Sequence, residues 1–266
     1  MRQRRKLWKA PASVAFVVVI AAAAFAVGWR VSRQQSPAST AVTLAQHTDP
    51  KGLASSLSTE TVDVFGGSMA HGWADPHDDS YLKRAFAARQ QSTNTNYHIV
   101  DRTVDGGQAD YFETEKPGLY ESDLKTDKPQ IVVLSWGLLN DMHAKSSLAV
   151  FDSAIHDQIA KALAVHAVVL LVTPPVTEAS QKGDHPMQEV YIAHEIADAQ
   201  AFHSKNVYVF DVYHQMEAYL KAHHQTWQNY YGDSWHPDAA GHALAGALLA
   251  NDLVTAFGSG PIRFTS

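Results

Sequence analysis

Two uninterrupted apolar runs, residues 129–136 (PQIVVLSW) and residues 167–173 (AVVLLVT), constrain the fold of this chain more than any other feature. A run that is apolar at nearly every position, instead of at every second one, predicts a strand that is buried on both faces of its sheet. Such strands occur in parallel sheets, where helices cover both faces and connect one strand to the next. We therefore expect an α/β fold.

Further elements of the same two kinds alternate along the chain after residue 60. The sequence predicts strands also at residues 61–65, 97–104 and 207–212, and helices at residues 81–91, 148–166, 186–203 and 239–257. Five strands separated by helices predict a flavodoxin-like three-layer α/β/α sandwich with a five-stranded parallel sheet. In such a sheet the functional site forms where the carboxyl ends of the strands meet.

The N-terminal segment has the pattern of a membrane anchor. Residues 1–9 are a basic head, and residues 10–30 carry no charge before the Trp29-Arg30 pair. Twenty helical residues span roughly 30 Å, the thickness of a hydrocarbon core. A cleaved secretory signal is the alternative, with Ala24-Phe25-Ala26 as the cleavage site. We favour an uncleaved transmembrane anchor, because signal cores are usually only about 7–15 residues long.

The arrangement around this segment predicts where the protein is located. The positive-inside rule places residues 1–9 in the cytoplasm and the rest of the chain outside. Residues 31–59 are rich in Ser, Thr, Gln and Ala, which is typical of a flexible linker, and residues 60–266 form the folded domain. We expect a single-pass protein of the cell membrane, or a secreted protein if the segment is cleaved.

Charge and cysteine content exclude several classes of function. Residues 1–33 hold seven of the 21 Lys and Arg residues and no acid, so the rest of the chain has 14 basic and 27 acidic residues. An acidic body without a basic stripe is unsuited to binding nucleic acid. The chain has no cysteine, which excludes disulfides and thiolate-bound metals.

Chemically capable residues follow the predicted strands. Ser68 comes after Gly66-Gly67 at the end of the strand at 61–65, Gly106-Gly107 follow the second strand, and Asn140 follows the third. Because the carboxyl ends of parallel strands meet at one edge of the sheet, these residues should lie close together. Near the C-terminus, Asp233 and His236 stand three residues apart before the final predicted helix.

This set of residues fits nucleophilic catalysis. A turn between Asp233 and His236 can bring the carboxylate to Nδ1 of the imidazole and leave Nε2 free for the Ser68 hydroxyl. The backbone N–H of Ser68, the N–H of Gly106 or Gly107, and the Asn140 amide can serve as an oxyanion hole. The chemistry needs no metal and no cofactor.

Four segments resemble the sequence blocks of the SGNH (GDSL-type) hydrolases over about residues 61–257. They are FGGSMA, the glycine after the second strand, WGLLND and DSWHPDAAGH. The resemblance implies Ser68 as nucleophile, Ser68, Gly106 and Asn140 as the oxyanion hole, and Asp233 and His236 as the rest of the triad. The chain departs from the family pattern twice: Gly67 replaces its usual Asp, and one extra residue precedes Asn140 in the G-x-N-D block.

We therefore expect an extracytoplasmic serine esterase that acts on short acyl groups, such as O-acetyl groups of polysaccharide. The partners expected are a small-molecule or polysaccharide ester and, through the N-terminal helix, the membrane. A lipase or lysophospholipase, an O-acyltransferase of the same family and an inactive glycan-binding module are alternatives. A flavodoxin-like mononucleotide binder has the same predicted architecture.

Other residues near the motifs have less specific patterns. The stretch HGWADPHDD (71–79) mixes His and Asp, but we find no H-E-x-x-H-like helical pair and expect no metal site. We expect His71 to be exposed, and His242 to face solvent or pack on the last helix. Three tryptophans flank the motifs and belong either to a pocket or to the core: Trp73, Trp136 and Trp235.

Overall fold

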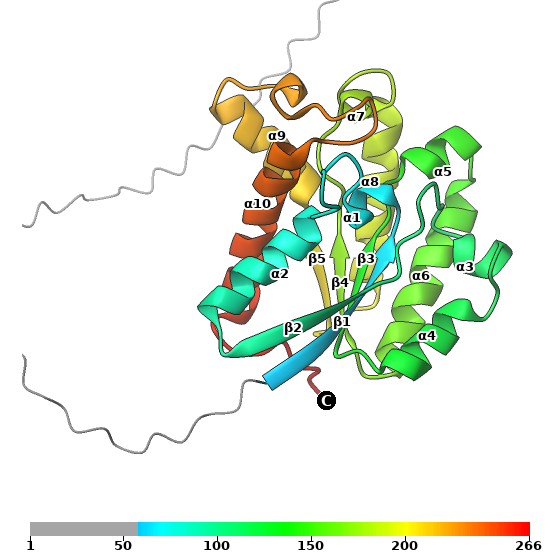
Figure 1. The fold of residues 1–266 in the computed structure, drawn as a ribbon. Coiled ribbons are helices and arrows are strands. Elements are labelled where there is room, and N and C mark those ends of the chain that lie inside the picture. Colours follow the sequence, from blue (N-terminus) through cyan, green and yellow to red (C-terminus); the bar gives the residue numbers. More distant parts are fainter. Residues whose placement is uncertain (1–57) are drawn as a thin grey trace, which may run out of the picture. The chain divides into compact units, whose positions relative to one another are not determined.

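A computed structural model of the protein describes residues 58–266 (Figure 1). The predicted basic head, the predicted anchor and nearly all of the predicted linker lie outside these residues. Within the described part, no helix combines the length and the apolar character needed to cross a bilayer.

The centre of the fold is one parallel sheet of five strands in the order β2-β1-β3-β4-β5. The strands are β1 (Ser58–Gly66), β2 (Thr95–Asp101), β3 (Ile131–Ser135), β4 (Val168–Val172) and β5 (Val207–Phe210). Every residue of β3 and β4 is buried, as their continuous apolar runs predict. The predicted five-stranded parallel sheet is confirmed, and its strand order is the flavodoxin-like one.

Helices lie on both sides of this sheet (Figure 1). Helix α2 packs against α10 on one side, while α6 packs against α8 and contacts α4 on the other. The long helices are α2 (Tyr81–Ser92), α6 (Leu148–Ala164), α8 (His185–Ala201) and α10 (Ala239–Phe257). All four were predicted, with bounds that differ by no more than two residues.

Several shorter helices have no counterpart in the sequence-based prediction. They are α1 (Ser68–His71), α3 (Tyr111–Thr114), α4 (Leu119–Asp127), α5 (Leu139–Ala144), α7 (Glu178–Gln181), α9 (Val212–Ala222) and the 3-10 helix η1 (Trp227–Tyr230). Asp211 explains one of these differences. Its carboxylate accepts the backbone N–H of His214 at 3.2 Å, so Asp211 caps α9, and β5 ends at Phe210.

Candidate active site

Ser68 lies where β1 turns into α1, at the carboxyl edge of the sheet. The turn depends on Gly66, because a Cβ atom there would lie 2.1 Å from the carbonyl oxygen of Ser135 in neighbouring β3. The close approach of β1 to β3 therefore requires glycine at this position. The Ser68 side chain is left partly exposed at the start of α1.

His236 and Asp233 come from a tight loop before α10. The backbone N–H groups of Gly232 and Asp233 both donate to the His236 carbonyl, at 3.1 and 3.0 Å. This turn places both Asp233 carboxylate oxygens against Nδ1 of the imidazole, at 2.8 and 3.0 Å. On the other side of the ring, Nε2 is 2.7 Å from Ser68 Oγ, although the two residues are 168 positions apart in sequence. The structure thus joins the three predicted residues in one hydrogen-bonded chain.

The surroundings of Asp233 keep its carboxyl group ionised. Partial burial favours the neutral acid, but hydrogen bonds from the Trp235 N–H and from His236 outweigh it, and the pKa of Asp233 is lowered. An ionised carboxylate beside Nδ1 holds a proton on that nitrogen, which directs the Nε2 lone pair at the Ser68 hydroxyl.

The oxyanion-hole candidates surround the same turn. The Asn140 side-chain amide donates to the Gly107 carbonyl at 3.1 Å, which fixes the amide and leaves its second N–H for another acceptor. The Gly107 N–H donates to the Val104 carbonyl at 2.9 Å and is already used by the turn. The geometry therefore favours Gly106, which has a φ of +75°, over Gly107 as the backbone donor.

A tight turn at Leu138 accommodates the extra residue in the block around Asn140. Leu138 has a φ of +65°, and the N–H of Leu139 donates across it to the Gly137 carbonyl at 2.8 Å. This tight turn shortens the path of the chain, and the fully buried Leu138 side chain holds it in place. Asn140 consequently reaches Gly107 despite the longer block.

Asp141 is a buried residue that the sequence analysis did not single out as a site residue. Both of its carboxylate oxygens accept the Ala109 N–H, at 3.2 and 3.3 Å, and burial raises its pKa to about 7. Asn140 and Asp141 therefore both bind the loop that contains Gly106, one at Gly107 and the other at Ala109. The sequence signal for a role of Asp141 was its position directly after Asn140 in the G-x-N-D block.

The tryptophans near the motifs divide into two groups. Trp136 is 1% exposed and donates to Gln158 in the core. Trp73 is 47% exposed, and its ring centroid lies 5.8 Å from that of His236. Trp235 lies beside His143, with ring centroids 4.6 Å apart. Of the three rings, that of Trp73 thus lies beside the triad.

The structure also shows the environments of His242 and His71. His242 is fully buried on α10, and its Nε2 donates to the Trp73 carbonyl at 3.1 Å, so it packs on the last helix and does not face solvent. His71 is partly exposed and pairs with Asp105 at 3.0 Å. His71 ends the helix α1 that Ser68 begins, and Asp105 directly precedes Gly106.

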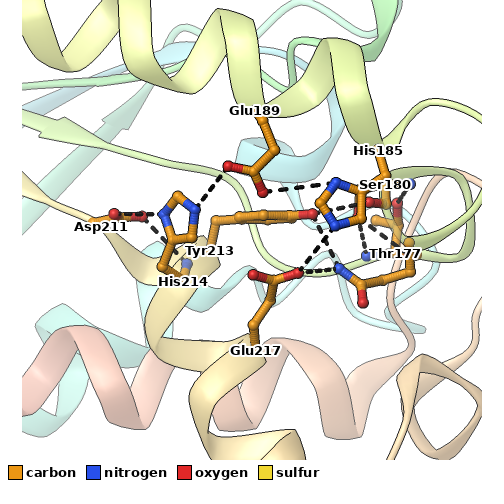
Figure 2. A network of polar contacts seen from close by, with 9 residues as sticks. Thr177, Ser180, His185, Glu189, Asp211, Tyr213, His214 and Glu217 are labelled. Carbon is orange, nitrogen blue, oxygen red and sulfur yellow. Dashed lines mark hydrogen bonds and ion pairs between the residues drawn. The ribbon is translucent and has the colours of Figure 1, made fainter. Parts of the chain in front are cut away.

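A second polar cluster, on α7, α8 and α9, is absent from the sequence-based predictions (Figure 2). It contains His185 and Glu189 of α8, and His214 and Glu217 of α9. The residues form the pairs H-x-x-x-E and H-x-x-E. Both differ from the H-E-x-x-H pattern, whose absence was the reason to expect no metal site.

A Ser–His–Asp chain at the carboxyl edge of a parallel sheet is an arrangement that serine hydrolases use. The model of the GDSL-like lipase/acylhydrolase family matches residues 64–244, and the chain therefore belongs to this family. This confirms the resemblance noted from the sequence, and the protein is an ester-hydrolysing enzyme. No curated protein sequence matches the chain.

Solved structures of low sequence identity share the fold. A lipase/acylhydrolase from Enterococcus faecalis is 19% identical, with a TM-score of 0.55 over 76% of this chain and 99% of that chain. A catalytic mutant of an acetylxylan esterase from Geobacillus stearothermophilus is 14% identical, with a TM-score of 0.57 over 78% of this chain and 99% of that one. The protein YxiM from Bacillus subtilis is 21% identical, with a TM-score of 0.57 over 77% of this chain. The match spans only 59% of the length of YxiM.

Proposed function

We propose that this enzyme is an extracytoplasmic serine esterase that removes short acyl groups, above all O-acetyl groups of polysaccharide, through Ser68, His236 and Asp233. The observation that carries the proposal is the 2.7 Å contact between Ser68 Oγ and His236 Nε2, with Asp233 bound to the other ring nitrogen. An apposed nucleophile and base, with an acid that orients the base, is the requirement for acyl transfer at a serine.

The reaction proceeds in two acyl-transfer steps. Ser68 Oγ attacks the ester carbonyl while His236 Nε2 takes the hydroxyl proton, and the negative charge of the tetrahedral intermediate lies on the former carbonyl oxygen. The N–H groups of Ser68 and Gly106 and the free Asn140 N–H donate to this oxygen. His236 then gives its proton to the leaving alcohol. Finally, His236 takes a proton from water while the water oxygen attacks the acyl carbon. The bond to Ser68 Oγ then breaks, His236 returns the proton to Oγ, and the acid leaves.

Two features support a carbohydrate ester as the substrate. Trp73 places an aromatic ring beside His236 of the triad and remains 47% exposed. Exposed aromatic faces of this kind suit contact with the apolar faces of sugar rings. One of the structural neighbours is named as an acetylxylan esterase.

The basic head and the apolar run of residues 10–30 support an extracytoplasmic location.

Labelling and turnover test the mechanism. We expect the wild-type protein to react with a fluorophosphonate probe and to hydrolyse p-nitrophenyl acetate, and Ser68→Ala to lose both properties. Full turnover by Ser68→Ala would rule out Ser68 as the nucleophile.

An ester panel tests the substrate separately. It contains p-nitrophenyl esters of increasing acyl length, acetylated xylan and acetylated peptidoglycan. We expect acetate to be released from at least one glycan and kcat/KM to fall as the acyl chain lengthens. A preference for long acyl chains would instead identify a lipase.

A further inference from the structure

Two neighbouring helices each present a histidine and a glutamate on one face. His185 and Glu189 are four residues apart in α8, and His214 and Glu217 are three residues apart in α9. Both spacings bring side chains together on a helix surface. Figure 2 shows the side chains of the two helices converging on one region.

The distances among these side chains are close to those of a metal site. His185 Nδ1 lies 3.7 Å from Glu189 Oε1, and His185 Nε2 lies 4.0 Å from Glu217 Oε1. One ligand atom from each of these three residues lies within 4.8 Å of the other two. Donors around tetrahedral Zn²⁺, with bonds of about 2.0–2.2 Å, stand about 3.4 Å apart. All three side chains are only partly buried, and to bind one ion the imidazole of His185 has to turn a single nitrogen toward both carboxylates.

His214 lies next to this group of three and holds one of its carboxylates, that of Glu189. Its Nε2 is 2.9 Å from Glu189 Oε2, and its Nδ1 is 2.7 Å from Asp211 Oδ2. Asp211 is itself fixed, because it caps α9 and accepts the Thr173 hydroxyl at 3.2 Å. Carboxylates that bind metals are usually held by hydrogen bonds of this kind.

The cluster also carries a surplus of acceptors. Three carboxylates converge on it, from Asp211, Glu189 and Glu217. The neighbouring Lys182 binds Glu178 instead. Gln181, which donates to Glu217 Oε1, holds that carboxylate in place without neutralising it. A divalent cation would balance this charge and satisfy donors on both helices at once.

We propose that His185, Glu189 and Glu217 bind one Zn²⁺ ion that links α8 to α9, with water as the fourth ligand. One imidazole, two carboxylates and a water match the four-coordinate preference of Zn²⁺, whereas Mg²⁺ and Ca²⁺ favour oxygen donors alone. The triad residues come from α1 and from the loop before α10, so the ion takes no part in the ester chemistry. The proposal is independent of the proposed substrate.

Metal titration of the full chain, solubilised in detergent and stripped with a chelator, tests the site. Isothermal titration calorimetry measures binding of Zn²⁺, and the visible absorption of bound Co²⁺ reports tetrahedral coordination. We expect micromolar or tighter Zn²⁺ binding at one site and an intense Co²⁺ band. His185→Gln, Glu189→Gln and Glu217→Gln should each weaken binding at that site tenfold or more.

The matched control is His194→Gln, which removes another partly exposed α8 histidine that pairs with a carboxylate, Asp152, at 3.0 Å. It should leave Zn²⁺ affinity and the Co²⁺ spectrum unchanged. Esterase turnover and the melting temperature in chelator show whether each variant is folded. The proposal is overturned if the wild type lacks micromolar binding and the Co²⁺ band, or if the folded variants among the three substitutions bind Zn²⁺ as the wild type does.

Discussion

At the scale of single residues, the two glycines before Ser68 meet different constraints. A Cβ at Gly66 would lie 2.1 Å from the Ser135 carbonyl oxygen and 2.9 Å from the Ala70 Cβ. At Gly67 the nearest atom would be 3.6 Å away, and its φ of −95° suits any residue. No steric requirement therefore explains why this chain has Gly67 where relatives have Asp.

These contacts predict opposite results for two substitutions. Gly66→Ala should force β1 away from β3 and lower the free energy of unfolding by about 3 kcal/mol or more, or prevent folding. Gly67→Asp should fold normally and change stability by only a few tenths of a kcal/mol, since Asp and Gly are both accepted N-cap residues. Urea denaturation of both variants measures this. Equal losses in the two variants would contradict the explanation.

Asp233 tests the orientation of the imidazole. In Asp233→Asn, the side-chain oxygen can still accept the N–H groups of Trp235 and His236, which now bind Asp233 at 2.8 and 2.9 Å, so the loop should persist. The amide no longer fixes the correct His236 tautomer, and we expect kcat to fall by about 10³–10⁴-fold with little change in KM. Turnover of p-nitrophenyl acetate measures the effect. A loss smaller than tenfold would show that Asp233 does not have this role.

The sequence predicted individual site residues from two signals: their position after a strand, and the three-residue spacing of Asp233 and His236. Ser68, Gly106 and Asn140 were predicted from their positions after strands that end at one edge of the sheet. The choice of Gly106 over Gly107 depends on the Val104 hydrogen bond, which no spacing rule indicates. The His–Glu cluster of the proposed metal site was not predicted from the sequence, because it forms between α8 and α9, and α9 itself was not predicted.

At the scale of secondary-structure elements, β1 contains an unpaired acid. Asp63 is fully buried, and among the described residues neither of its carboxylate oxygens has a hydrogen-bond partner. Burial is the main cause that raises its pKa to about 7, and the neighbouring Asp127 adds to the effect. Burial in β1 therefore favours the neutral form of the Asp63 carboxyl group.

The raised pKa predicts that stability falls as pH rises. Between the unfolded pKa, near 4, and the folded pKa of about 7, the native state keeps a proton at Asp63 that the unfolded chain has lost. The free energy of unfolding should decrease across this range and stay low above it. Glu113 and Asp141, with pKa values also raised to about 7, contribute in the same direction.

Asp63→Asn isolates one of these contributions. The substitution should raise the free energy of unfolding at pH 8, by on the order of 3 kcal/mol, and change it little at pH 4. Denaturation at the two pH values measures this, with the exposed Glu115→Gln as the control expected to show no change. A stability gain of the same size at both pH values would exclude ionisation as the cause.

Elements with strong apolar patterns were predicted well, and those without them were missed. The buried strands β3 and β4 and the long helices have continuous or periodic apolar runs. Helix α4 buries only Tyr120, Asp123 and Leu124, too few residues for a recognisable period. Helix α9 depends on the cap at Asp211, a residue that the sequence analysis assigned to the preceding strand.

At the scale of the whole molecule, the described part contains every residue of the proposed catalytic machinery. The predicted membrane anchor lies in residues 10–30, outside that part. Deletion of residues 1–57 should therefore release the enzyme from the membrane and leave kcat/KM for p-nitrophenyl acetate within about twofold. Ultracentrifugation of membranes and turnover by both forms measure this. A truncated chain that still sediments with membranes would contradict the proposed anchor.

The loop that carries His236 can open while the core of the molecule stays folded. Ser68 is fixed by the sheet, whereas the loop with Asp233 and His236 is held by the Tyr231–Pro237 bridge and by two hydrogen bonds between α7 and Ser234. Opening of this loop separates base from nucleophile while the five strands stay paired. Heat should consequently inactivate the enzyme before it melts, and cooling should restore activity as long as the sheet has survived.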